Sequence, residues 1–105
     1  MSTPEGDFKA QVIAFFNKTG EWIIRQNPGK LKVKRGYLHG APEGTADFLI
    51  MRNPVGWLEL KAPGQKTKKE RVAKQTEFRD KVLALGHKHC QAESLEDVQR
   101  FLSSW

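Results

Sequence analysis

Two short apolar runs in the middle of the chain are separated by a cluster of turn-forming residues. The runs are residues 47–51 (DFLIM) and 57–64 (WLELKAPG), and residues 53–56 (NPVG) lie between them. Short runs of β-forming residues around a break that contains Pro and Gly predict two adjacent antiparallel strands of a hairpin. We expect the rest of the fold to be organised around this hairpin.

Charged residues share one face of the hairpin. Because side chains alternate between the two faces of a strand, Glu59 and Lys61 point to the same side as Trp57. With a loop of about four residues, Asp47 falls opposite residues 60–62. Two neighbouring carboxylates repel each other, and a divalent cation between them removes the repulsion. The alternative is that Asp47 only begins a strand and that Glu59 forms a solvated ion pair with Lys61.

Apolar residues recur at helical spacing over residues 8–16 and predict an N-terminal helix. Residues 3–5 (TPE) resemble a helix opening, with an N-cap, a proline at the first helical position and an acid in the first turn. Glu5 lies three residues before Phe8 and therefore follows the apolar stripe. A first-turn acid usually complements the helix dipole, which is the simplest role for Glu5.

A second helix is predicted between the capping pattern Thr67-x-x-Glu70 and the helix stop at Gly86. Its expected apolar face consists of Val72, Phe78, Val82 and Leu85. Gln75 lies within this face, so its amide needs a partner: either a loop carbonyl, or a water or phosphate near Lys61. The opposite face carries basic residues, Arg71 among them, which either extend a DNA-binding surface or keep the helix soluble.

The remaining elements complete an α/β pattern. Strands are expected at residues 21–25 and 87–92, a closing helix begins at Ser94, and residues 36–45, with three glycines and a proline, are expected to form a loop. The order α-β-(β)-β-β-α-β-α predicts a small mixed central sheet flanked by helices. At 105 residues, the chain is expected to form one domain over residues 1–105.

The charge of the chain favours a polyanionic partner. Eighteen Lys and Arg residues against twelve Asp and Glu residues give a formal charge of +6. Residues 30–35 (KLKVKR) place several of these charges on one face of an extended segment, with Arg25 just upstream. Sequence-independent binding of nucleic acid comes chiefly from such residues at the phosphate backbone, although a single lysine there is more often only solvated.

Other function classes find little support in the sequence. No apolar run approaches the roughly 20 residues of a membrane span, and the N-terminus lacks the features of a secretory signal. We therefore expect a soluble, cytoplasmic protein. Cys90 is the single cysteine, and together with His87 and His89 it lacks the paired spacing of a zinc site.

An ordered set of motifs resembles a known nuclease family. Asp47, twelve positions before Glu59-Leu60-Lys61, is similar to the D…(D/E)XK signature of the PD-(D/E)XK, or restriction-endonuclease-like, superfamily. The longer order is similar to that of VRR-NUC domains and covers nearly the whole chain. It consists of Glu5, Gly20, Arg25-Gln26-Asn27, Gly44-Thr45-Ala46-Asp47, Glu59-Leu60-Lys61-Ala62-Pro63-Gly64, Gln75 and Phe78.

This resemblance implies a divalent-metal-dependent DNA endonuclease with a restriction-endonuclease-like core. It implies that Asp47, Glu59, Lys61 and Gln75 form the catalytic set. The metal ion, Mg²⁺ or Mn²⁺, would be held by Asp47, Glu59, the backbone carbonyl of Leu60 and an additional acid on the first helix, for which Glu5 is favoured and Asp7 competes. The expected DNA contacts are Arg25, Asn27, Lys30, Lys32, Lys34, Arg35, Lys66 and Lys68.

The resemblance also implies a homodimer that cuts branched DNA, including four-way junctions, and the terminus from Leu102 to Trp105 is a candidate part of the dimer interface. Two alternatives stay open at this point. The first is a catalytically inactive, basic nucleic-acid-binding module. The second is a protein-interaction domain whose charge only aids solubility.

Overall fold

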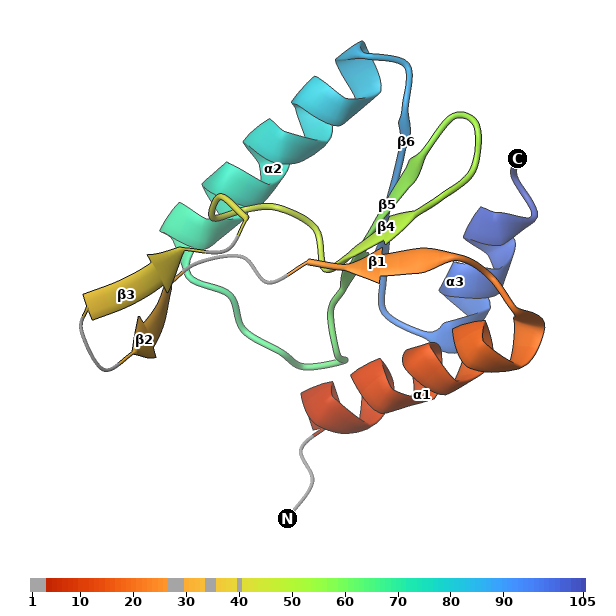
Figure 1. The fold of residues 1–105 in the computed structure, drawn as a ribbon, viewed down its shortest axis with the longest axis horizontal. Helices are drawn as coiled ribbons and strands as arrows, with labels where there is room; N and C mark the ends of the chain where they lie inside the picture. Colours follow the sequence, from red (N-terminus) through yellow and green to blue (C-terminus); the bar gives the residue numbers. More distant parts are fainter. Residues whose placement is uncertain (1–3, 27–29, 34–35, 40) are drawn as a thin grey trace.

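A mixed four-stranded sheet forms the centre of the molecule (Figure 1). The computed structural model describes residues 4–26, 30–33, 36–39 and 41–105, and the side chains of residues 6–26 and 41–105. The strand order is β1 (Ile23–Arg25), β4 (Phe48–Ile50), β5 (Gly56–Leu60) and β6 (Lys88–Ala92). The first three strands are antiparallel, and β6 runs parallel to β5 because α2 connects the two.

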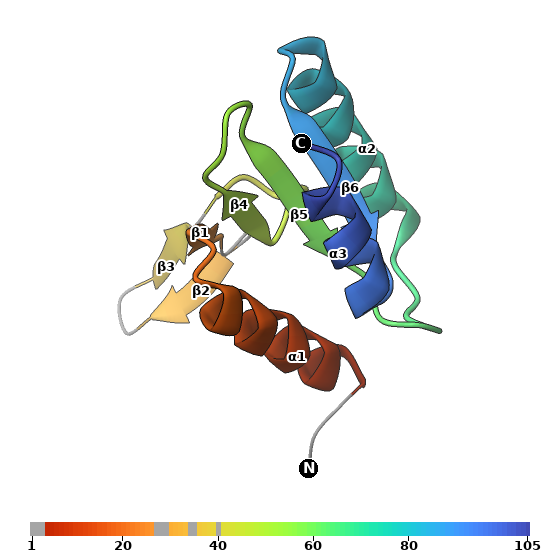
Figure 2. The same ribbon diagram turned by 90° about the vertical axis from the view of Figure 1, so that its right-hand side faces the viewer.

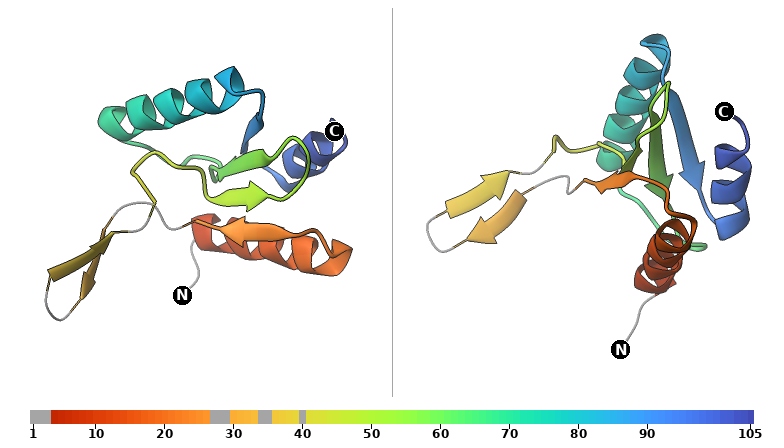
Figure 3. Two further views of the ribbon diagram at one scale, coloured as in Figure 1. Left: turned by 45° about the horizontal axis from the view of Figure 1, so that its top comes forward. Right: turned by 45° about the vertical axis from the view of Figure 1, so that its right-hand side comes forward.

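Helices cover both faces of this sheet (Figures 2 and 3). Helices α1 (Pro4–Thr19) and α3 (Leu95–Leu102) lie on one face, and α2 (Lys69–Ala84) lies on the other. The predicted α/β class, a small mixed sheet flanked by helices, is confirmed. Among the described residues, no helix is long and apolar enough to cross a membrane, and the cytoplasmic location stays a prediction.

The core lies between the sheet and the pair α1 and α3. Helix α1 contributes Phe8, Val12 and Phe16 at the predicted helical spacing, and all three are buried. The alternate residues of the strands face them, because a strand presents every second side chain to one side. The strand and α3 residues of this core are Phe48, Ile50, Leu58, Leu60, Ala92 and Val98.

The hairpin of β4 and β5 has a longer loop than the sequence suggested. Ile50 pairs with Gly56 and Phe48 pairs with Leu58, so the loop holds residues 51–55. Continuing this register one residue before β4 places Asp47 opposite Glu59. The prediction that Asp47 lies opposite residues 60–62 was therefore wrong, because the loop length sets the register of a hairpin. The corrected register brings the two acids directly opposite each other.

A second, two-stranded sheet projects beside the main one (Figure 3). Its strands are β2 (Lys30–Val33) and β3 (Gly36–His39), with Lys30 paired to His39 and Lys32 to Tyr37. The prediction of an uninterrupted loop over residues 36–45 was wrong for its first four residues. The glycines suggested a loop, but the apolar and aromatic residues between them pair with β2.

The apolar contacts of helix α2 with the rest of the fold lie in its C-terminal half. Phe78 packs edge-on against Trp57 at 5.0 Å between ring centroids, and Val82 is buried. Val72 and Leu85 are 43% and 76% exposed, so their assignment to a buried face was wrong. In the N-terminal half of the helix the polar Gln75, rather than Val72, contacts the sheet, through its hydrogen bond to Glu59 on β5.

Two of the three predicted helix-end signals around α2 and α3 are confirmed. The N-cap of α2 is Lys68, which makes no side-chain capping bond, so the capping box at Thr67 is not formed. Gly86 has the positive φ of 86° that ends a helix in the left-handed conformation. Ser94 caps α3 as predicted, because its hydroxyl accepts a hydrogen bond from the Asp97 backbone N–H at 3.2 Å.

The C-terminal Trp105 packs against its own chain. Its indole N–H donates to the Pro54 carbonyl at 2.7 Å, and its ring lies 4.8 Å from that of Phe101. A Cβ atom at Gly56 would overlap the ring, so the strand can approach Trp105 only because this position lacks a side chain. Trp105 is therefore half-buried against its own chain, and a part for residues 102–105 in a dimer interface stays a prediction.

Candidate active site

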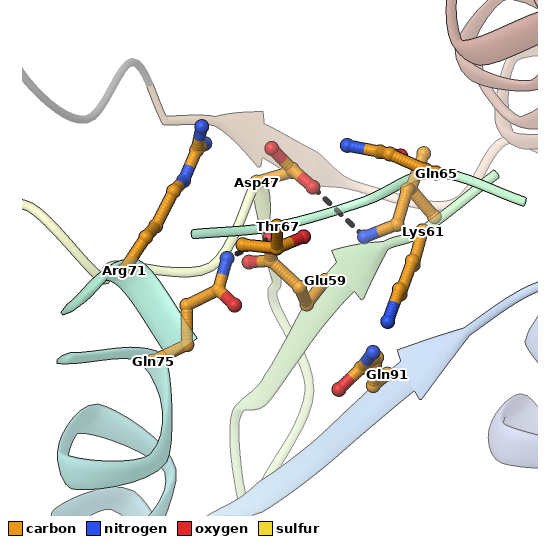
Figure 4. A pocket seen from close by; sticks show the side chains of 9 residues that line it. Asp47, Glu59, Lys61, Gln65, Thr67, Arg71, Gln75 and Gln91 are labelled. Carbon is orange, nitrogen blue, oxygen red and sulfur yellow. Dashed lines mark hydrogen bonds between the residues drawn. The ribbon is translucent and has the colours of Figure 1, made fainter. Parts of the chain in front are cut away.

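A small polar cavity opens where β5 meets the N-terminal half of α2 (Figure 4). Its volume is about 20 Å³, which is room for a water molecule or a single small ion. The lining residues come from β5, α2, β6 and the adjoining loops. They are Asp47, Glu59, Leu60, Lys61, Gln65, Thr67, Arg71, Gln75 and Gln91.

The segment before β4 holds Asp47 at this cavity. Gly44 has a φ of 93°, and a Cβ atom there would lie 2.7 Å from the Lys74 backbone of α2, so this position requires glycine. The buried Thr45 donates hydrogen bonds to the Pro42 carbonyl from its backbone at 3.1 Å and its hydroxyl at 2.6 Å. Ala46 is fully buried. The Gly-Thr-Ala-Asp motif therefore has a structural reason at each step.

Hydrogen bonds orient both acids. Asp47 Oδ2 accepts from the backbone N–H of Leu60 at 2.8 Å, and Glu59 Oε1 accepts from Gln75 Nε2 at 3.0 Å. The partner of Gln75 is thus the neighbouring carboxylate rather than a loop carbonyl. Glu59 is only 8% exposed, which excludes the alternative of a solvated ion pair on an open face.

The environment of Glu59 disfavours its charge. Burial, followed by the negative charge of Asp47, raises the pKa of Glu59 to about 8. The positive charges of Arg71 and Lys9 and the backbone N–H of Asp47 act in the opposite direction. Functional sites often contain a buried carboxyl group whose pKa is strongly raised. Glu59 fits this description, because it lies in a cavity beside a second acid.

The donor set of the cavity fits a small, hard cation. Mg²⁺ prefers oxygen ligands and is commonly held by one or two carboxylates together with several waters. Asp47 and Glu59 supply two such carboxylates and lie next to the Leu60 backbone. Among the described residues, no three His, Cys, Asp or Glu side chains come together, so a further protein acid would have to come from outside that part of the chain.

The fourth predicted catalytic residue, Lys61, lies at the same cavity. In Figure 4 its ammonium group extends to the Gln91 side, below the acid pair. The guanidinium group of Arg71 lies on the other side of the acids, above Gln75 in this view. Four predicted catalytic residues thus line one cavity, with a positive side chain on each flank of the acids.

Sequence reasoning missed several residues of the cavity. Arg71 was assigned to the opposite face of its helix from Gln75, yet both line the cavity. Their spacing of i and i+4 was the available signal, because such residues share a helix face. Lys9 lies on α1 close enough for its charge to act on Glu59, and nothing in its sequence context indicated this. Gln91 reaches the cavity through the parallel pairing of β6 with β5.

The additional acid on the first helix is only partly described. Glu5 lies in the first turn of α1, but its side chain falls outside the described residues. Asp7, the competing residue, is exposed and forms no three-residue acidic cluster with Asp47 and Glu59. The assignment of Glu5 therefore stays a prediction.

The expected DNA contacts are distributed over several segments. Arg25, at the end of β1, and Lys66 and Lys68, on the loop before α2, are exposed. The backbones of Lys30 and Lys32 belong to β2, and their side chains fall outside the description. The expected contacts outside the described residues altogether are Asn27, Lys34 and Arg35.

One solved structure is similar to the whole chain. It is described as a "VRR_NUC domain", the alignment covers 99% of both chains, and the TM-score is 0.57. The chain has the fold of a VRR_NUC domain. The fold implied by the sequence motifs is therefore confirmed. The two chains are 17% identical, so the VRR_NUC likeness is one of fold, and the chemistry has to be argued from the cavity. No protein-family model matches the sequence, and no curated protein matches it.

Proposed function

We propose that this protein is a divalent-metal-dependent endonuclease that hydrolyses DNA phosphodiester bonds. The observation that carries the proposal is the convergence of Asp47, Glu59, Lys61 and Gln75 on one cavity of a VRR_NUC fold. Asp47 and Glu59, with the Leu60 carbonyl and Glu5, would hold Mg²⁺ or Mn²⁺. The bound cation would offset phosphate charge and lower the pKa of a coordinated water.

The chain's own residues have separate tasks in this proposal. Gln75 fixes the rotamer of Glu59 through the 3.0 Å hydrogen bond, so the carboxylate keeps its place when its charge changes. Lys61 places its ammonium group at the same cavity, where it can donate to a phosphate oxygen that gains charge in the transition state. The exposed Arg25, Lys66 and Lys68 bind phosphates outside the cavity.

We propose further that the protein acts as a homodimer on branched DNA. One chain offers one such cavity among its described residues, whereas symmetrical cutting of a four-way junction needs two coordinated cuts, which a twofold-symmetric pair provides. Light scattering during junction cleavage tests this. A monomer at every concentration, together with paired cuts, would contradict it.

The main experiment compares labelled linear, flapped and four-way DNA, each with Mg²⁺, Mn²⁺ or EDTA. We expect cleavage with either cation, none with EDTA, and a preference for branched DNA. The variants Asp47→Asn and Glu59→Gln control for a contaminating nuclease, because a contaminant would cut DNA equally well in the wild-type and variant preparations. Binding without any metal-dependent cleavage would support an inactive nucleic-acid-binding module instead.

A further inference from the structure

Arg71 is a cation of the cavity to which the predicted catalytic set gives no role. It is the third residue of α2 and lies one helical turn before Gln75 on the same face of the helix. In Figure 4 its guanidinium group lies on the side of the acids away from Lys61. Its side chain is exposed, whereas the carboxylate of Glu59 is buried.

The donors of Arg71 are free within the described part of the chain. The Arg71 side chain forms no hydrogen bond there and no ion pair within 4 Å. Other arginines of the molecule have carboxylate partners: Arg52 binds Glu21 at 2.7 Å, and Arg100 binds Asp97 at 3.2 Å. Arg71 thus reaches a site with two acids without closing a salt bridge to either of them.

This arrangement suits a ligand that carries its own negative charge. A guanidinium group has five N–H donors in a planar fork, and the fork matches two oxygens of a phosphate. An arginine that only compensated the acids would gain most by direct contact with them. Arg71 instead leaves its exposed guanidinium group available to a ligand at the cavity.

We propose that Arg71 binds a backbone phosphate of the substrate strand on the side of the acid pair opposite Lys61. The inference rests on the proposed nuclease function and adds a strand-positioning contact to it. With Lys61 on one flank and Arg71 on the other, the strand is held at two points, and the phosphate between them lies over Asp47 and Glu59. Arg71 thereby fixes which phosphate of the strand enters the cavity.

The test measures the coupling between this side chain and one phosphate. A fluorescein-labelled flap duplex is prepared as a series in which a neutral methylphosphonate replaces one phosphate at a time across the branch. Binding is measured by anisotropy in EDTA for the wild type, Arg71→Gln and Arg71→Lys. Arg100→Gln is the matched control, because it removes the same charge on α3, across the sheet from the cavity.

We expect one methylphosphonate position to weaken wild-type binding roughly tenfold, the effect of losing a charge-assisted hydrogen bond. Arg71→Gln should bind the unmodified duplex about tenfold more weakly, with a salt slope reduced by about 1, and should be insensitive to that position. Arg71→Lys should restore only part of the affinity, because it keeps the charge without the fork. Arg100→Gln should keep the wild-type pattern.

Two outcomes would overturn the inference. In one, Arg71→Gln keeps the wild-type sensitivity at every phosphate. In the other, Arg71→Gln and Arg100→Gln lose affinity equally, which would make Arg71 an ordinary surface charge. Failure of the proposed function is a separate result, because a wild-type protein that cuts no DNA with Mg²⁺ or Mn²⁺ still yields the binding comparison in EDTA.

Discussion

Replacing Glu59 by Gln should remove a pH dependence from the stability of the metal-free protein. The pKa of Glu59 is about 8 in the folded protein, whereas the ordinary value for a glutamate side chain is 4.5. A carboxyl whose pKa rises on folding binds its proton more tightly in the folded state. Its stabilising contribution is therefore complete at pH values below the unfolded pKa and is lost as the pH rises through the folded pKa.

The size of the effect follows from the shift. One pKa unit corresponds to about 1.4 kcal/mol, so raising the pH from about 6.5 to about 8.5 should lower the free energy of unfolding by at most about 2 kcal/mol. Two other groups with shifted pKa values contribute less than Glu59 within this pH window. Burial lowers the pKa of His89 to about 4, and its contribution is lost only as the pH falls below its unfolded value. Burial raises the pKa of Cys90, whose contribution is lost only above its usual range.

The assay is urea denaturation followed by far-UV circular dichroism at both pH values. EDTA is present throughout, because a bound cation would hold Glu59 ionised. The free energy of unfolding of Glu59→Gln should be nearly the same at both pH values. At the higher pH it should exceed that of the wild type. The control is Glu77→Gln, an exposed glutamate on α2, which should keep the wild-type slope. An unchanged slope in Glu59→Gln would refute the reasoning about this buried acid pair.

Four further predictions concern activity, binding and packing. Asp47→Asn should lower cleavage by orders of magnitude while DNA binding survives, and wild-type cleavage by the folded variant would make Asp47 structural. Lys61→Met should keep metal affinity, measured by calorimetry, and slow single-turnover cleavage; an unchanged rate would remove Lys61 from the chemistry. DNA affinity should fall on the order of a thousandfold between about 50 and about 200 mM salt, and a flat response would count against phosphate binding. Gly56→Ala should destabilise the fold by about 1–3 kcal/mol in urea titrations, because its Cβ atom overlaps Trp105; an unchanged midpoint would contradict the packing.

The sequence was sufficient where local pattern and packing agree. The stripe of α1 and the alternation of β5 identify the buried faces, because periodicity reports which side of an element meets the core. The spacing of Asp47 and Glu59 around a turn identified the acid pair for the same reason. These predictions depend only on residues close together in the chain.

Predictions failed where long-range geometry decides. Helix α2 has the spacing of an amphipathic helix, but Val72 is exposed and the polar Gln75 meets Glu59 instead. No local pattern states how far a helix overlaps its sheet. The predicted placement of Arg71 was wrong for the same reason. Arg71 was assigned to the exposed face because Val72 was assumed to lie on the buried face. Lys9 and Gln91 reach the cavity through tertiary packing and through the parallel pairing of β6.

The register of one hairpin connects the C-terminus to the chemistry. Asp47 and Glu59 face each other only if β4 and β5 pair as they do, because a shift by one residue would turn a strand's side chains to the other face. The last pair of that ladder ends at Gly56, beneath the ring of Trp105. A shift of β5 by one residue would bring Val55 or Trp57 to this place, and neither side chain fits under the ring. The C-terminal tryptophan, on the far face of the sheet from the cavity, therefore helps to select the strand pairing that brings the two acids together.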